Sequence, residues 1–211
     1  QQLFKHELSE ELIVINKIQG LGSVNSVYEV HGEGKKYIIR LNQEEKWAEY
    51  QKEDWCMQQV AQLDIPVPTV ISLGQKKGIV FMIQDLIPGI NGANCDPEEK
   101  ARIWQTLGSY ASTFQKIDRI ADQEVKRTLL HRNWRERLAY NLTELHERDS
   151  LLELEFFNWQ EQKEIKQVLH RLEEKSFRTG LVHGDLCPRN VIFSDNTVHL
   201  IDWGTAELNV V

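Results

Sequence analysis

The hydrophobic pattern of this chain changes near residue 86. Before that point, short apolar runs alternate with polar positions, and this period of two is typical of β-strands. After residue 96, apolar residues return every three or four positions, as they do on amphipathic helices. The pattern predicts an α+β fold in which residues 1–86 form an antiparallel sheet with one main helix, and residues 87–211 form a mostly helical part that carries one hairpin.

The N-terminal part should contain five strands and one long helix. In the helix, predicted over residues 44–63, Cys56, Val60 and Leu63 share one stripe, which extends backward to Glu53 and Glu49. A carboxylate on a buried face needs a cation, and Arg40 on the third strand can supply it. We expect Glu53 rather than Glu49 to be its partner, although both could also be solvated. The strands are predicted at 12–15, 28–30, 35–41, 70–73 and 79–83, with a turn at 75–78 between the last two.

The C-terminal part should begin with a strongly marked helix. Asp96 is a capping residue, Pro97 takes the first helical position and Glu99 the third, which is an N-terminal signature. Further helices are predicted around 134–145 and 165–172. The aromatic segment 156–159 could bind a cationic group by cation–π contact, but we favour core packing between helices. The first helix carries the apolar stripe Ile103, Leu107, Tyr110, Phe114 and Ile117.

The predicted hairpin is bordered by polar residues that can do chemistry. His183-Gly184-Asp185 is followed five residues later by Asn190, and the strands predicted at 191–193 and 197–201 lead back to Ile201-Asp202-Trp203-Gly204. Ser194-Asp195-Asn196 supplies the turn between them. Asn190 and Asp202 should therefore face each other at the open end of the hairpin.

The residue types at this hairpin favour phosphoryl transfer. Asn190 and Asp202 offer the hard oxygen atoms that magnesium binds, and Asp185 could accept or orient a hydroxyl proton, as in the H-x-D-x-x-x-x-N template. Ordinary turn chemistry is the alternative, although three oxygen residues at this spacing are hard to obtain from it. A zinc site at His183, Asp185 and Cys187 is a weaker interpretation, because no second Cys or His stands nearby at ligand spacing.

A glycine-bearing turn near the N-terminus fits the same chemistry. Gly20, Gly22, Ser23 and Asn25 lie in a G-x-G-x-x-N-x-V stretch between the first two predicted strands. Such a loop can cover phosphates, yet on its own it equally describes a plain hairpin turn. Arg40 would then orient the phosphates with its planar fork, unless it is only a surface strand residue.

These motifs together resemble those of the aminoglycoside phosphotransferase and choline kinase group, and the similarity also includes residues 65–68, 81–89 and 107–114. The resemblance implies a two-lobed protein-kinase-like fold and assigns roles to individual residues. Asp185 would be the catalytic base, Asn190 and Asp202 would hold magnesium, and Arg40 and Glu53 would form the phosphate-orienting pair. Residues 20–25 would cover the phosphates, and the backbone around Gln84, Asp85 and Leu86 would receive adenine.

The resemblance implies an ATP- and Mg2+-dependent phosphotransferase acting on a hydroxyl group of a small molecule, with GTP not excluded as donor. An aminoglycoside-type antibiotic is the leading acceptor. A choline- or sugar-type metabolite is the alternative, as is a catalytically silent nucleotide-binding or partner-binding remnant. In the family further helices follow the metal-binding loop, so we expect the C-terminal lobe to be cut short at Val211. Protein kinases fit less well, because the H-R-D, D-F-G and A-P-E forms are missing.

Composition narrows the partners. Lys and Arg number 25 against 32 Asp and Glu, and the net charge of −7 disfavours nucleic acid and anionic membranes as partners. It suits a cationic acceptor weakly, since acidic charge also serves solubility. No apolar run has the length of a membrane span, the first residues lack the order of a signal peptide, and the three cysteines lie far apart. We therefore expect a cytoplasmic enzyme without disulfides, and the oligomeric state stays open.

Overall fold

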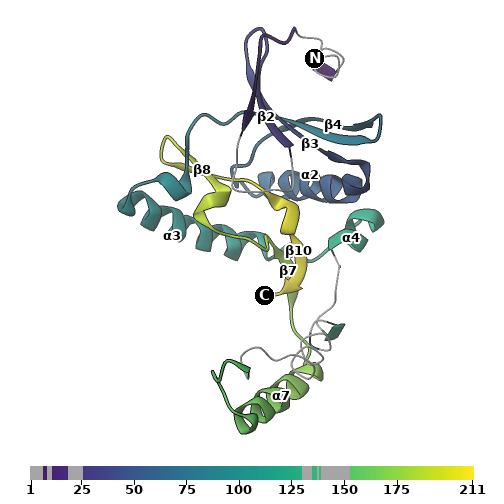
Figure 1. The fold of residues 1–211 in the computed structure, drawn as a ribbon, viewed down its shortest axis with the longest axis vertical. Helices are drawn as coiled ribbons and strands as arrows, with labels where there is room; N and C mark the ends of the chain where they lie inside the picture. Colours follow the sequence, from purple (N-terminus) through teal and green to yellow (C-terminus); the bar gives the residue numbers. More distant parts are fainter. Residues whose placement is uncertain (1–6, 9–10, 19–25, 130–134, 137, 139–152) are drawn as a thin grey trace.

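The computed structural model describes residues 7–8, 11–18, 26–129, 135–136, 138 and 153–211. Its N-terminal half is a five-stranded antiparallel sheet with the strand order β1-β2-β3-β5-β4. Helix α2 (Trp47–Ala61) covers one face of this sheet (Figure 1). The strands are β1 (Val14–Ile18), β2 (Ser26–His31), β3 (Lys36–Gln43), β4 (Val70–Lys76) and β5 (Ile79–Asp85).

Alternation along the central strands decides which residues meet α2. On β5, Val80 and Met82 belong to the core cluster on the α2 side, whereas Phe81 and Ile83 pack on the opposite face of the sheet. Arg40 on β3 lies directly opposite Met82 in the antiparallel register. Residues opposite each other share a face, so Arg40 points toward α2.

Two hairpins close with turns of two residues. The turn between β4 and β5 contains only Lys77 and Gly78, both with positive φ, so β4 continues three residues beyond the predicted end at 73. Asp195 and Asn196 also have positive φ and connect the C-terminal hairpin. Two consecutive left-handed residues produce the twist that closely paired strands need, and Gly, Asp and Asn tolerate that conformation.

Helix α2 is shorter than predicted. Residues Glu44–Lys46 form a 3-10 turn, and the α-helix runs from Trp47 to Ala61. Its buried face is also broader than the predicted stripe, because Tyr50 and Lys52 are buried beside Glu53, Cys56 and Val60, whereas Leu63 beyond the helix end is exposed.

The C-terminal half contains helices around two small sheets. Helix α3 begins with the expected capping box, in which Asp96 accepts from the Glu99 backbone at 2.8 Å and Pro97 is the first helical residue. One sheet has the order β6-β8-β9, and β10 pairs with β7. The elements are β6 (Ile90–Asn91), α3 (Pro97–Phe114), α4 (Gln123–Leu129), α7 (Trp159–Glu173), β7 (Thr179–Val182), β8 (Val191–Ser194), β9 (Thr197–Leu200) and β10 (Glu207–Val210). The α+β class is thus confirmed.

The preference for core packing of the aromatic segment is wrong. Phe156 and Trp159 are each 74% exposed, and Phe157 is half-buried. They stand at the N-terminal turn of α7, which Asn158 caps, and α7 lies at the end of the molecule farthest from the sheet (Figure 1). The helix predicted around 134–145 falls mostly outside the described residues. Leu138, which is described, is buried.

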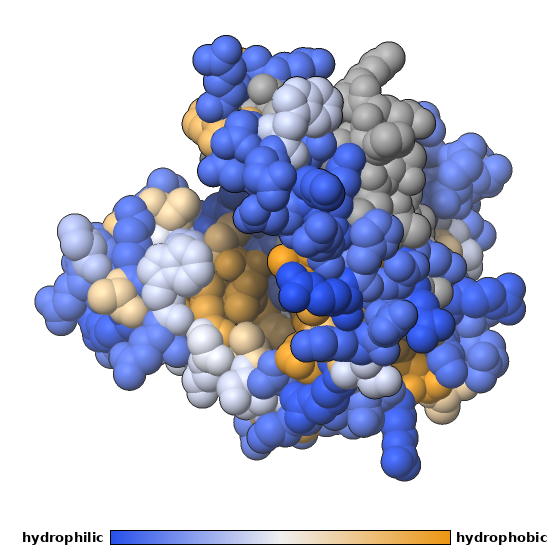
Figure 2. All heavy atoms as spheres, turned by 90° about the horizontal axis from the view of Figure 1, so that it is seen from below, coloured by the Kyte–Doolittle hydropathy of each residue, from blue (hydrophilic) through white to orange (hydrophobic). Residues whose placement is uncertain are grey.

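One hydrophobic core joins the two halves. It unites Val60 and Met82 from the sheet side with Leu107 of α3, Leu200 of the hairpin and Trp203 behind it. The lower face of the molecule, seen in Figure 2, is mainly hydrophilic and is hollowed over a group of hydrophobic residues. Among the helices that the structure describes, none is both long and apolar enough to cross a membrane.

Candidate active site

The hairpin β8–β9 brings the predicted metal ligands into register. Val191 pairs with Leu200, and the backbone N–H of Ile201 donates to the carbonyl of Asn190 at 3.0 Å. Asn190 and Asp202 therefore stand at the same open end of the hairpin, as the sequence indicated. Asn190 is buried, whereas Asp202 is exposed.

His183 connects the two polar loops. Its ring is 1% exposed, and its Nε2 lies 3.0 Å from the carbonyl oxygen of Ile201. A carbonyl can only accept, so Nε2 carries the proton and donates, which leaves Nδ1 to accept from the Asp185 backbone N–H at 3.4 Å. Burial lowers the pKa of His183, consistent with this neutral form. The histidine thereby fixes the loop of Asp185 against the strand that leads to Asp202.

Gly184 is required by the same contact. Its φ is +81°, and a Cβ at this position would lie 2.2 Å from the backbone oxygen of Thr205. The Thr205 hydroxyl also donates to the carbonyl of His183 at 3.0 Å. The two loops pack backbone against backbone, and only glycine fits between them.

Asp185 is held from two sides. One terminal nitrogen of Arg189 lies 2.7 Å from each carboxylate oxygen, and the Asn190 amide donates to Oδ2 at 2.9 Å and to the Asp185 backbone carbonyl at 2.8 Å. The Arg189 hydrogen bond is the main reason why the pKa of Asp185 lies below its usual range. The sequence interpretation missed Arg189, although its i+4 spacing from Asp185 was a usable signal.

Asp202 has an unusual backbone. Its φ and ψ are 62° and 69°, in the left-handed region that residues with a side chain rarely adopt and that Asn and Asp tolerate best among them. The following Trp203 is fully buried, with its ring centroid 4.6 Å from that of His183 and 5.4 Å from that of Phe114. Packing of Trp203 therefore holds a backbone conformation that is otherwise unfavourable.

The donor set fits magnesium. The amide nitrogen of Asn190 donates to Asp185, and its oxygen, which accepts no hydrogen bond among the described residues, can coordinate a metal ion together with the Asp202 carboxylate. Within the described part of the chain, no group of three or more His, Cys, Asp or Glu side chains could hold a metal ion. Magnesium needs only one or two protein oxygens when water and substrate phosphates supply the rest.

Arg40 and Glu53 form a buried ion pair. Arg40 Nη1 donates a hydrogen bond to Glu53 Oε2, and Nη2 donates to Oε1 at 3.0 Å. The guanidinium also lies 5.3 Å from the centre of the Tyr50 ring. Burial alone would lower the pKa of Arg40, but the charge of Glu53 outweighs it and raises that pKa. Glu49 is instead half-buried and pairs with Lys46. The expected choice of Glu53 over Glu49 is confirmed.

A cavity of about 520 Å³ separates the sheet from the hairpin. Arg40 and Ile38 form its roof, Ile192, Ile201 and Asp202 its floor, and residues 84–89 its back wall. Most of this lining is apolar, and its charged members are Glu29, Arg40, Asp85 and Asp202. An apolar cleft that also holds a cation and carboxylates suits a planar ring attached to a charged group.

The hinge segment at the back wall differs in detail from the expectation. The side chain of Gln84 points into the core and donates to Met57 Sδ at 3.3 Å, and the Leu86 N–H is used by the Lys36 carbonyl at 3.1 Å. In contrast, the Ile87 N–H has no hydrogen-bond partner among the described residues, and Ile87 lines the cavity. The sequence interpretation missed Ile87, because only strand pairing reveals which hinge amide stays free.

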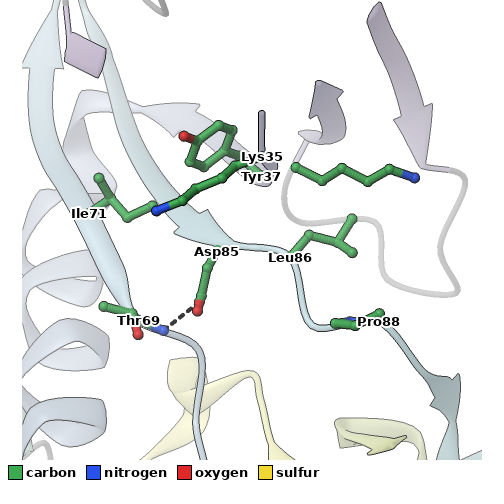
Figure 3. Close-up of a pocket in the computed structure, with 8 residues that line it drawn as sticks. Lys35, Tyr37, Thr69, Ile71, Asp85, Leu86 and Pro88 are labelled. Carbon is green, nitrogen blue, oxygen red and sulfur yellow. Dashed lines mark hydrogen bonds between the residues drawn. The ribbon is translucent and has the colours of Figure 1, made fainter. Parts of the chain in front are cut away.

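Asp85 stabilises the hinge as well as lining the cavity. Its Oδ1 accepts from the Thr69 backbone N–H at 2.6 Å, and its own N–H donates to the Thr69 carbonyl at 3.1 Å (Figure 3). Lys35 and Tyr37 lie nearby and line a second cavity. Tyr37 alternates with Ile38 and Arg40 along β3, so its side chain lies on the other face of the sheet, and the two cavities share Asp85, Leu86 and Pro88 at the hinge.

Four predicted site residues cannot be placed. Gly20, Gly22, Ser23 and Asn25 lie outside the described residues.

Cys56, Cys95 and Cys187 are free thiols.

The sequence is similar to known proteins. Residues 17–210 match the phosphotransferase enzyme family. A segment of 44 residues, 21% of this chain, is 34% identical to the probable serine/threonine-protein kinase BUD32 homolog of Archaeoglobus fulgidus, and it spans only 23% of that relative.

Solved structures share the fold at low identity. The GDP and kanamycin complex of APH(2")-IIIa has a TM-score of 0.70 and 15% identity over 99% of this chain and 73% of its own. Spectinomycin phosphotransferase APH(9)-Ia, with ADP and spectinomycin, has a TM-score of 0.61 and 19% identity over 99% and 69%. A putative fructosamine-3-kinase from Haemophilus somnus has a TM-score of 0.64 and 14% identity over 99% and 72%. The two-lobed kinase-like fold is thereby confirmed.

Proposed function

The chain belongs to the phosphotransferase enzyme family, and from this premise we propose that it transfers the γ-phosphate of a nucleoside triphosphate to a hydroxyl group of a small molecule. One observation carries the proposal. Arg40, the hinge and Asp202 all line the one cavity of about 520 Å³, so a base, a triphosphate and a metal-binding carboxylate can share it.

On the donor side, residues 1–86 act as the nucleotide-binding lobe and residues 87–211 as the catalytic lobe. Adenine lies against the hinge, where the free N–H of Ile87 can donate to a ring nitrogen. Arg40, held flat by Glu53, orients the phosphates, and residues 20–25 cover them. ATP is our preferred donor, with GTP as the alternative, since relatives of this fold are described with ADP and with GDP.

On the catalytic side, Asn190 and Asp202 hold magnesium, which when bound neutralises charge on the phosphates. Asp185 hydrogen-bonds the acceptor hydroxyl and aims it in line. It receives the hydroxyl proton as the acceptor oxygen bonds to the γ-phosphorus and the bond from that phosphorus to the bridging oxygen breaks, which releases the nucleoside diphosphate. Its lowered pKa makes it a weak base, so orientation outweighs proton abstraction at the start of the reaction. Arg189 and Asn190 fix the direction of the Asp185 carboxylate.

For the acceptor, we propose an aminoglycoside-type antibiotic. The net charge of −7 favours a cationic, hydroxylated molecule, and structural neighbours are described with kanamycin and spectinomycin. A sugar-type acceptor is the alternative, in line with the fructosamine kinase among those neighbours.

The test is an acceptor panel with ATP or GTP and magnesium, followed by nucleoside diphosphate release and mass spectrometry of the product. It compares the wild type with Asp185→Asn, and includes aminoglycosides, spectinomycin, choline and glycated amines. We expect one class to gain 80 Da, the mass of one added phosphoryl group, and Asp185→Asn to lower kcat by about 10²–10⁴-fold while nucleotide still binds. Equal turnover by Asp185→Asn would contradict the assigned base.

A further inference from the structure

Lys52 is a buried cation that the chemistry described above does not use. Its residue is 5% exposed, and its Nζ donates to the backbone carbonyl of Gly204 at 2.5 Å. Lys52 lies on α2 beneath the sheet, whereas Gly204 follows Asp202 in the loop of the other lobe, 152 residues later. Burying an ammonium group is costly unless it gains something specific.

Gly204 lies between the two functional carboxylates. A Cβ at this position would stand 3.3 Å from Glu53 Oε1 and 3.5 Å from Asp202 Oδ1. The loop backbone thus packs directly on Glu53, the residue that holds Arg40. Because Lys52 and Glu53 are consecutive, α2 grips the metal-binding loop at one residue and the phosphate-orienting arginine at the next.

The loop also needs such a grip. Asp202 has a left-handed backbone, which costs free energy unless neighbours hold it. Trp203 anchors the loop from the core side, and the Lys52 bond is the link from α2 on the other side.

We propose that Lys52 is a positioning residue that ties the metal-binding loop, residues 201–204, to α2, so that Asp202 is placed for magnesium only when Arg40 is placed for phosphate. This rests on the proposed function for its consequence, but the tie itself exists without nucleotide. Lys52 touches neither substrate nor metal; it acts through Gly204.

The test uses three variants. Lys52→Met keeps the length of the side chain and removes the donor, Lys52→Arg restores a donor, and Lys52→Gln serves if the methionine variant does not fold. Lys46→Met is the matched control, since Lys46 precedes the same helix and, among the described residues, pairs with the half-buried Glu49. Lys52→Met leaves the Gly204 carbonyl without its donor, so a purely structural Lys52 already predicts a lower melting temperature, but it predicts no change in how strongly magnesium increases ATP affinity.

Two measurements decide. First, hydrogen exchange in the nucleotide-free protein should be about tenfold faster at the amides of residues 203–206 in Lys52→Met, with Lys46→Met unchanged. Second, calorimetry should show that the increase in ATP affinity caused by magnesium falls about tenfold in Lys52→Met and recovers in Lys52→Arg, while ATP affinity without magnesium stays within about twofold.

The outcomes separate the two claims. Unchanged exchange in Lys52→Met, or the same change in Lys46→Met, would overturn the positioning role. If the wild type itself binds no nucleotide, the proposed function fails, and the exchange result alone then decides whether Lys52 holds the loop.

Discussion

Arg40 on β3 and Glu53 on α2 are joined by two hydrogen bonds inside a site where neither is more than 9% exposed. The pair fixes the helix to the sheet at the roof of the nucleotide cavity. The two hydrogen bonds to Glu53 and the contact with the Tyr50 ring together fix the orientation of the Arg40 guanidinium. Burial raises the pKa of Tyr50 to about 12, so its ring stays neutral.

Breaking this pair should cost much stability. Glu53→Gln leaves the buried Arg40 charge uncompensated, and we expect the free energy of unfolding to fall by about 3–5 kcal/mol in urea titrations. Glu49→Gln, four residues earlier, removes a carboxylate whose side chain is 43% exposed, and it should change the free energy of unfolding by less than about 0.5 kcal/mol. The double variant Arg40→Met/Glu53→Met should regain most of the stability without regaining activity. Equal effects at positions 49 and 53 would refute the buried pair.

Glycine 184 offers a test of the loop contact. Gly184→Ala places a Cβ 2.2 Å from the Thr205 carbonyl and forces a residue with a side chain into positive φ, so it should destabilise the protein by several kcal/mol and abolish turnover. Gly108→Ala, in the middle of α3, meets no atom within 4 Å and should stabilise by about 0.5–1 kcal/mol. Melting curves of both variants compare the two directly, and a stable Gly184→Ala would speak against the close packing of these loops.

Burial of His183 should make stability fall in mild acid. Its folded pKa is lowered below the unfolded value of about 6.5. Between these two values the unfolded chain binds more protons, so the stability from this group is complete above about pH 6.5 and is lost as pH falls toward the folded pKa.

Urea unfolding of wild type and His183→Asn at about pH 7.5 and about pH 5.5 measures this contribution. We expect a smaller loss of stability on acidification in the variant. His199 also has a pKa lowered by burial, so both proteins should carry His199→Asn in a second comparison. Identical pH dependence with and without His183 would contradict its burial in the neutral form.

The sequence predicted the hairpin well because its signals are local. Turn residues at 195 and 196, β-branched flanks and the spacing of Asp185, Asn190 and Asp202 lie within a span of about twenty residues, where register follows from the turn. The capping box of α3 is equally local. Glu53 was favoured over Glu49 as the partner of Arg40, but helix spacing alone barely separates the two residues. The register of β3 decides between them.

Other features depend on contacts distant in sequence. In the sequence, Lys52 resembles any solvent-facing lysine on a helix, and only the fold places Gly204 against it. Likewise, only the fold shows that the Leu86 N–H donates to the Lys36 carbonyl while the Ile87 N–H has no partner among the described residues. The aromatic residues 156 and 159 were assigned to the core by their type, yet their place at the start of α7 leaves them exposed. Residue type predicts burial only where a second element is positioned to cover it.

The most direct test of the account is calorimetric titration of ATP into the wild type and Asp202→Asn, each with and without magnesium. We predict that magnesium strengthens ATP binding to the wild type at least about tenfold and has little effect on Asp202→Asn, because that variant loses the charged ligand at the hairpin. ATP binding that is absent from both proteins, or equally dependent on magnesium in both, would contradict the assignment of this hairpin as a metal–nucleotide site.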